Sequence, residues 1–149
     1  PPLFIVNPHS ESGKTGKRWP DMLSQIQSRF GKVAVALTEG PGHATTLTRE
    51  ALQKGATHVV SVGGDGTLNE VLNGWLEADQ PLNPEAELGL IMRGTGGDFR
   101  KSLGLENDLH AYLDTLAEAP SRPVDVGKVT LTQADGSPIQ RYFLNISSF

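Results

Sequence analysis

Short apolar runs alternate with stretches of helical spacing along the first ninety residues. Residues 3–6, LFIV, form an apolar run that is typical of a strand covered on both faces. From about Lys17 to Phe30, apolar residues recur at the spacing of an amphipathic helix, with Pro20 in its first turn and Gly31 after its end. The pattern predicts a strand, a loop and a helix in that order.

The same alternation continues as far as residue 92. It predicts strands over 32–38, 57–62 and 87–92 and helices over 42–55 and 67–78, with a Pro-rich loop before the last strand. Strands that alternate with helices are joined by crossover connections and pair in parallel. We therefore expect an α/β fold, a three-layer sandwich with a mostly parallel sheet.

The last third of the chain has a different pattern. A short polar helix is expected near residues 98–103 and a further helix near 108–117. Two strand-like segments, 124–132 and 139–147, flank an Asp-Gly pair that favours a tight hairpin turn. The chain is therefore expected to change from parallel to antiparallel pairing near its end.

Composition narrows the class of protein. A chain of 149 residues suits one domain with one core. A formal charge of -4 without a basic run argues against nucleic acid as the main partner. The absence of cysteine excludes a disulfide framework and cysteine-based metal sites and fits the cytoplasm. No apolar run approaches the roughly 20 residues that a membrane-spanning helix needs.

Three polar loops follow predicted strands, at the edge of an open parallel sheet where ligands bind. The first, NPHSESGKTG, ends like a phosphate-binding P-loop, but Pro8 occupies the position of the required glycine. It is therefore not a Walker P-loop. Lys14, Lys17 and Arg18 beside it could steer phosphate, although a solvated helix face is the favoured interpretation.

The second loop, GGDGT over residues 63–67, combines three glycines with one carboxylate. Glycines let backbone N–H groups approach an anion, and a helix that starts near Thr67 would offer its N-terminus to phosphate. Asp65 in such a site is explained if a Mg²⁺ ion or a hydroxyl proton is handled beside the phosphates. The alternative is that Asp65 is the N-cap of the helix in a tight turn.

The third loop, RGTGGDF over residues 93–99, repeats the combination of small residues, a hydroxyl and an acid. Taken alone it is also explained by a glycine-rich turn in which Asp98 caps the next helix. Neither this loop nor GGDGT completes the GxGxxG pattern, so a Rossmann dinucleotide site is disfavoured.

In chain order, these motifs resemble the diacylglycerol kinase catalytic-domain family, which includes bacterial lipid kinases, sphingosine kinases and ceramide kinases. Residues 7–19, 37–47, 59–74 and 94–104 carry the resemblance. It implies a nucleotide-binding domain of the NAD kinase and phosphofructokinase type that uses ATP and Mg²⁺ and transfers the γ-phosphoryl group to a lipid hydroxyl. Asp65 would be the catalytic and metal-binding residue. The implied nucleotide site comprises Asn7, Ser10, Thr38, Gly63, Gly64, Asp65, Gly66, Thr67, Leu68, Asn69, Glu70 and Thr95.

The chain departs from the family pattern at two positions and in length. Gly97 stands where the family usually has Asn, and Met92 where it often has Pro. Family members are about twice as long, with a second, β-rich domain that supplies much of the lipid pocket and the general base. The resemblance therefore implies that residues 1–149 are a single N-terminal ATP-binding domain, inactive by itself, with the crossover to the second domain beginning near 121–149.

The implied partners are ATP or ADP and a lipid acceptor such as diacylglycerol, reached at the inner membrane face by a cytoplasmic protein. Nucleic acid is not among them. Two other functions remain open. One is a soluble-metabolite kinase of the NAD kinase type, although no second Thr-Pro-Thr-Gly-Ser-like segment is present. The other is a nucleotide-binding module without catalysis.

Overall fold

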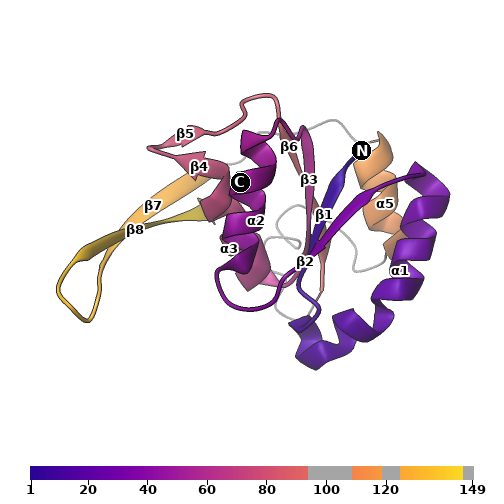
Figure 1. The fold of residues 1–149 in the computed structure, drawn as a ribbon, viewed down its shortest axis with the longest axis horizontal. Coiled ribbons are helices and arrows are strands. Elements are labelled where there is room, and N and C mark those ends of the chain that lie inside the picture. Colours follow the sequence, from indigo (N-terminus) through magenta and orange to yellow (C-terminus); the bar gives the residue numbers. More distant parts are fainter. Residues whose placement is uncertain (94–108, 119–124, 146–149) are drawn as a thin grey trace.

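The computed structural model describes residues 1–93, 109–118 and 125–145 (Figure 1). The sheet strands are β1 (Leu3–Val6), β2 (Ala34–Leu37), β3 (His58–Gly63) and β6 (Glu87–Met92). The helices are the 3₁₀ turn η1 (Ser10–Gly13), α1 (Lys14–Phe30), α2 (His43–Gln53), α3 (Asp65–Trp75) and α5 (Leu109–Glu118). Two hairpins are formed by β4 (Leu76–Glu77) with β5 (Gln80–Pro81), and by β7 (Asp125–Thr132) with β8 (Pro138–Asn145).

The central sheet has the strand order β2-β1-β3-β6, and all three pairings are parallel. In the register, Val6 lies opposite Leu37 on one side and Val62 on the other, and Val62 lies opposite Ile91. The carboxyl ends of the four strands therefore meet at one edge. The predicted α/β class with a mostly parallel sheet is confirmed.

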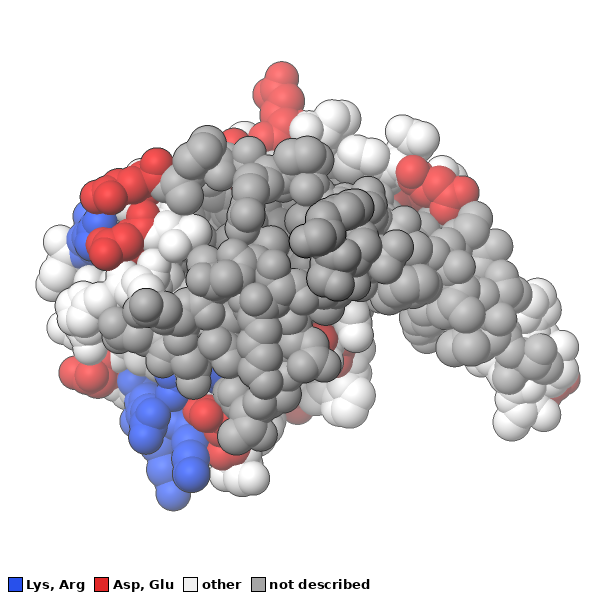
Figure 2. All heavy atoms as spheres, turned by 180° about the vertical axis from the view of Figure 1, so that it is seen from behind, with Lys and Arg blue, Asp and Glu red and all other residues white. Residues whose placement is uncertain are grey.

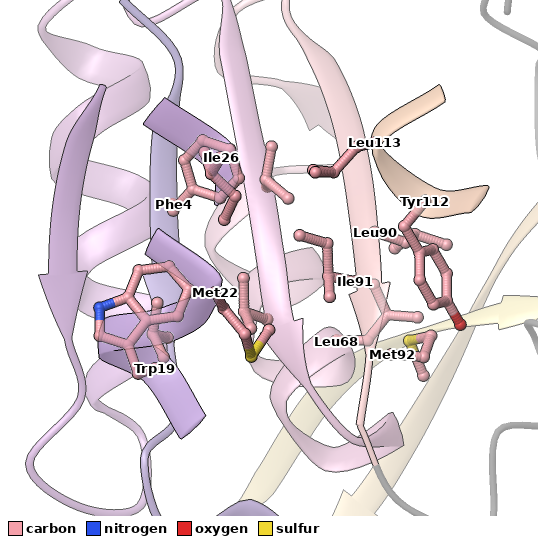
Figure 3. Packing of buried hydrophobic residues seen from close by; sticks show 13 residues of the cluster. Phe4, Trp19, Met22, Ile26, Leu68, Leu90, Ile91, Met92, Tyr112 and Leu113 are labelled. Atoms are coloured by element: carbon pink, nitrogen blue, oxygen red, sulfur yellow. The ribbon is translucent and has the colours of Figure 1, made fainter. Parts of the chain in front are cut away.

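Helices cover both faces of the sheet (Figure 1). On one face, Trp19, Met22 and Ile26 of α1 and Leu113 of α5 pack against the sheet around Phe4 (Figure 3). The α1 residues recur at helical spacing, so one stripe of this helix is buried. Burial of each such side chain contributes about 1.5–3 kcal/mol to folding.

On the other face, α2 and α3 pack against Ile5 and Val59 through Ala44, Leu52 and Val71. The two helices also approach each other closely at Gly74. A Cβ added there would lie 2.3 Å from the carbonyl oxygen of Thr45, so only glycine permits this packing distance. The three-layer arrangement places the N-termini of α2 and α3 at the edge of the sheet where its strands end.

Helix α1 begins earlier than its apolar pattern predicted. It starts at Lys14 and follows η1 directly, so Pro20 lies inside the helix rather than in its first turn. The missed segment, from Lys14 to Gly16, contains no apolar side chain, and its one buried residue, Thr15, is polar. Helical periodicity could only be read from Trp19 onward.

Helix α3 is displaced from its prediction in the same direction, since it begins at Asp65 and ends at Trp75. Leu76 and Glu77, predicted as the end of this helix, instead form β4 of a small hairpin, and its second strand, β5, lies in the Pro-rich segment that was predicted as a loop. The turn residues of this hairpin, Ala78 and Asp79, both have positive φ. The polar helix expected near 98–103 lies outside the described residues.

The predicted hairpin near the end of the chain is confirmed, because β7 and β8 pair in antiparallel fashion. At its turn, Asp135 Oδ1 accepts hydrogen bonds from the backbone N–H and the hydroxyl of Ser137, at 2.9 and 2.6 Å. These bonds lower the pKa of the Asp135 carboxyl below its usual value. Gly136 has a φ of 85°, which suits the Asp-Gly turn.

Candidate functional site

Backbone hydrogen bonds continue past the carboxyl ends of the strands and join the loops that follow. The amide of Thr38, after β2, donates to the carbonyl of Val6 at 2.8 Å. Asn7, after β1, donates to Val62 at 2.9 Å, and Arg93, after β6, donates to Gly63 at 2.7 Å. The predicted site positions Asn7, Thr38 and Gly63 are therefore brought to one edge of the sheet.

Asn7 links the first loop to the helix that follows GGDGT. Its Nδ2 donates a hydrogen bond to the hydroxyl of Thr67 at 3.2 Å. Its Oδ1 accepts one from the backbone of His9 at 3.0 Å. Because both ends of the amide are engaged, the Asn7 side chain fixes the first loop against α3.

The glycines of GGDGT have different surroundings. A Cβ added to Gly63 would lie 2.4 Å from Thr67 Oγ1, so the Thr67 side chain requires glycine there. A Cβ on Gly64 would lie 3.2 Å from the carbonyl oxygen of Arg93. Gly66 is exposed, and a Cβ there would meet no atom within 4 Å among the described residues. The fold thus requires the first glycine but leaves open space at the third.

Asp65 is the first residue of α3, and Gly64 precedes it as the N-cap. The interpretation of Asp65 as the N-cap is therefore wrong, and no side chain caps this helix. Asp65 Oδ1 is buried and has no hydrogen-bond partner among the described residues. A buried carboxylate oxygen without a donor is costly, so its chemistry fits a cation or the proton of a hydroxyl group.

The first loop is held by its own hydroxyl groups. Ser10 donates to the carbonyl of Asn7 at 3.1 Å and also forms a short hydrogen bond with the hydroxyl of buried Thr15. The Ser10 hydroxyl is therefore engaged within the loop. Basic side chains gather at the lower edge of the face in Figure 2, near the start of α1, where Lys14, Lys17 and Arg18 are exposed.

A cavity of about 370 Å³ opens between the start of α2 and α3. Glu70 at its wall accepts a hydrogen bond from the backbone N–H of Ala44 at 3.3 Å, and its carbonyl accepts one from the Thr45 hydroxyl at 2.7 Å. Glu70 therefore accepts from one of the N–H groups at the N-terminus of α2, whose N-cap glycine offers no side chain. The cavity is lined by Gly42, Thr45, Asn69, Glu70 and Asn73.

Other predicted site residues are placed differently. Leu68 lies in the core with 2% exposure, and its backbone N–H donates to the carbonyl of Gly64 at 3.1 Å. Neither its side chain nor this N–H is open to a ligand. Asn69 is exposed at the cavity wall. Thr95, like Gly97, lies outside the described residues.

Two charged residues at this edge were not among the predicted site residues. Arg93 and Glu11 form an ion pair, with Nη2 and Oε2 3.1 Å apart. Arg93 was recognisable as the first residue after a buried strand, in the loop RGTGGDF. Glu11 had no comparable signal, because a single acid in a polar loop is usually exposed.

Comparison with known proteins shows which family this chain resembles. The model of the family described as diacylglycerol kinase catalytic domain matches residues 1–129. Diacylglycerol kinases of Staphylococcus aureus, from strains bovine RF122 / ET3-1 and MRSA252, are each 34% identical over 145 residues. These alignments cover 97% of the chain and 42% of each relative. The chain thus spans less than half the length of the curated relatives that it matches.

A solved structure supports the same relationship. The crystal structure of a diacylglycerol kinase from Bacillus anthracis str. Sterne matches 96% of the chain and 45% of its own length, with a TM-score of 0.73 and 26% identity. Within the described residues, no helix has the length and apolar character needed to cross a membrane. The described part of the chain also contains no cluster of three or more His, Cys, Asp or Glu side chains that could hold a metal ion.

Proposed function

The chain belongs to the diacylglycerol kinase catalytic domain family, and from this premise we propose that it is the nucleotide-binding half of an ATP- and Mg²⁺-dependent lipid kinase. The observation that carries the proposal is Oδ1 of Asp65 in the first turn of α3, which has no partner among the described residues and lies next to Gly66, where these residues leave space for a Cβ. A buried carboxylate oxygen that no donor of the described residues reaches, next to a helix N-terminus that favours phosphate, suits a site for a metal-bound nucleotide.

Different residues of the candidate site would bind different parts of the nucleotide. Backbone N–H groups in the first turn of α3 have no partner inside the helix and would bind nucleotide phosphates. Asn7 and Thr67 keep the first loop and this turn in fixed relation. The half-open, polar cavity beside Glu70 lies between α2 and α3 and would take the nucleoside part.

Asp65 would hold the metal ion. Mg²⁺ is commonly bound by one or two carboxylates together with substrate phosphates, so a single protein carboxylate suffices in a nucleotide complex. When bound, the ion would neutralise charge on the phosphates during transfer.

The acceptor in the proposed reaction is a lipid hydroxyl, in diacylglycerol or a related lipid. Support comes from the name of the relatives, diacylglycerol kinase. Such an acceptor lies in a membrane, so the kinase would work as a peripheral protein at the inner face. The general base and most of the lipid pocket are expected in the part of the relatives that this chain does not match, so the chain alone would bind nucleotide without turnover.

Titration calorimetry of this chain with ATP, with and without Mg²⁺, tests the proposal. We expect a dissociation constant of roughly micromolar to millimolar, since about half of the cleft is contributed elsewhere. Parallel titrations with NAD test the alternative of a soluble-metabolite kinase of the NAD kinase type, which would bind NAD as well as ATP. Absence of heat and of an ATP-dependent rise in melting temperature at millimolar nucleotide would contradict the proposal.

A further inference from the structure

The ion pair between Glu11 and Arg93 reaches across the carboxyl end of β3. Glu11 lies in η1, which follows β1, and Arg93 follows β6. Strand β3 lies between these two strands in the sheet (Figure 1). Arg93 is also tied to the GGDGT loop through its backbone bond to Gly63. The ion pair therefore lies beside the loop that the proposed function assigns to phosphate.

Neither member of the pair has its full set of hydrogen bonds. The Arg93 side chain is 13% exposed and that of Glu11 is 22% exposed. Arg93 Nε and Glu11 Oε2 are buried and have no hydrogen-bond partner among the described residues. A guanidinium has five N–H donors, and a buried ion pair is unfavourable when its remaining donors are unsatisfied. Within the described part of the chain, Arg93 Nε thus remains a donor for a second anion.

The backbone that carries Glu11 is strained. Glu11 and Ser12 have φ values of 55° and 57°, so two consecutive residues with side chains adopt the left-handed conformation. This conformation is unfavourable for residues other than glycine and is retained where surrounding contacts impose it. The ion pair of Glu11 with Arg93 and the backbone hydrogen bonds of Ser10 to Asn7 and of Gly13 to His9 are among the contacts that hold this loop.

We propose that Arg93 binds a phosphate of the nucleotide and that Glu11 holds the guanidinium until that phosphate displaces the carboxylate. The proposal rests on the proposed function and extends it to two residues outside the predicted site. Guanidinium binds phosphate through paired, charge-assisted hydrogen bonds, which are stronger than an ion pair without hydrogen-bond geometry. The exchange replaces one anion by another, so the guanidinium never remains buried without a counter-charge.

This arrangement makes Glu11 a competitor of the nucleotide phosphates. A nucleoside without phosphates gains nothing from Arg93, whereas ADP and ATP gain a charge-assisted contact after displacing Glu11. The pair would therefore favour nucleotides that carry phosphates at this position. A purely structural ion pair would instead affect folding and leave the preference between adenosine and ATP unchanged.

The test compares ATP, ADP and adenosine binding to this chain and to the variants Glu11→Gln and Arg93→Gln by titration calorimetry. Glu11→Gln should bind ATP about 3- to 10-fold more tightly, because the competing carboxylate is lost. Arg93→Gln should lose about tenfold or more in ATP affinity, with adenosine affinity unchanged. Glu85→Gln, which removes an exposed acid before β6 at the opposite end of the strand, is the matched control and should leave all affinities unchanged.

Failure of this inference is distinguishable from failure of the proposed function. If the unaltered chain binds none of the nucleotides, both are overturned. If it binds ATP but Arg93→Gln binds within twofold of it, or Glu11→Gln binds more weakly, only the role of the ion pair is overturned. An equal gain in Glu85→Gln would also overturn it. If Arg93→Gln does not fold, Arg93→Lys is tested in its place. A partial loss of ATP affinity in this variant supports the proposal, and unchanged affinity contradicts it.

Discussion

The side-chain amide of Asn7 donates to the hydroxyl of Thr67 at 3.2 Å and joins the loop after β1 to the first turn of α3, 60 residues further along the sequence. Thr67 is buried and lies over Gly63, where a Cβ would collide with its hydroxyl. Asn7, Gly63 and Thr67 therefore form one unit, in which the end of β1, the end of β3 and the first turn of α3 fix each other. The candidate site is built on this unit.

We predict that Gly63→Ala destabilises the chain by about 1–3 kcal/mol, because the added methyl group must displace the Thr67 side chain. The displacement should also break the Asn7–Thr67 hydrogen bond and weaken ATP binding. Chemical denaturation measures the first effect and calorimetry the second. A variant as stable as the unaltered chain would show that Thr67 is not fixed over Gly63.

Unlike Gly63→Ala, the variant Gly66→Ala should lower ATP affinity without lowering stability. The added methyl group meets open space and lies in the first turn of a helix, so stability should stay the same or rise slightly. ATP affinity should fall about tenfold or more, because the methyl group keeps phosphate from the backbone. Thermal melts and calorimetry on the same samples check both statements, and unchanged ATP affinity would place the phosphates elsewhere.

Glu70 provides a third prediction through its bond to the start of α2. Glu70→Ala removes the acceptor for the Ala44 N–H and should cost about 1 kcal/mol of stability. In a chain of this size, that corresponds to a fall in melting temperature of about 2–4 °C. Glu70→Gln keeps an acceptor oxygen and should retain most of the stability. A large loss of stability in Glu70→Gln would show that the charge, rather than the hydrogen bond, stabilises the helix.

The parallel sheet and its loops could be predicted because each depends on local pattern. Buried strands such as Leu3–Val6 are continuously apolar, and polar glycine-rich segments follow them directly. The start of α1 could not be predicted this way. Its first turn buries Thr15, whose hydroxyl bonds to Ser10, and such a contact leaves no hydrophobic periodicity.

The features of the site that could not be predicted from the sequence are contacts between side chains that are distant in the sequence. Glu70 was predicted only as a residue of the nucleotide site, yet it accepts a hydrogen bond at the N-terminus of the neighbouring helix. Glu11 and Arg93 meet only because β1 and β6 flank β3. Strand order determines these contacts, and local sequence patterns do not specify which non-consecutive strands become neighbours.

The variant Lys14→Ala tests whether the first loop binds phosphate as a P-loop does. The Lys14 side chain is exposed at the first residue of α1, and Pro8 removes a backbone N–H that a P-loop would offer to phosphate. We predict that Lys14→Ala weakens ATP binding by about fivefold or less, since an exposed charge contributes about 1 kcal/mol or less. Lys17→Ala, which removes a neighbouring exposed charge, is the control. A hundredfold loss confined to Lys14→Ala would restore the P-loop interpretation.

The most direct test of chemistry is Asp65→Asn. Asn keeps the shape of Asp but not its charge, so the melting temperature without nucleotide should change by no more than a few degrees. Without the carboxylate that would hold Mg²⁺, the variant should lose most of the Mg²⁺ dependence of ATP binding by this chain, which calorimetry with and without the metal measures. In a full-length protein that contains this chain, steady-state kinetics with diacylglycerol should show kcat reduced by a factor on the order of a hundred or more. Turnover within a few-fold of the unaltered enzyme, at equal stability, would show that Asp65 only shapes the turn before α3.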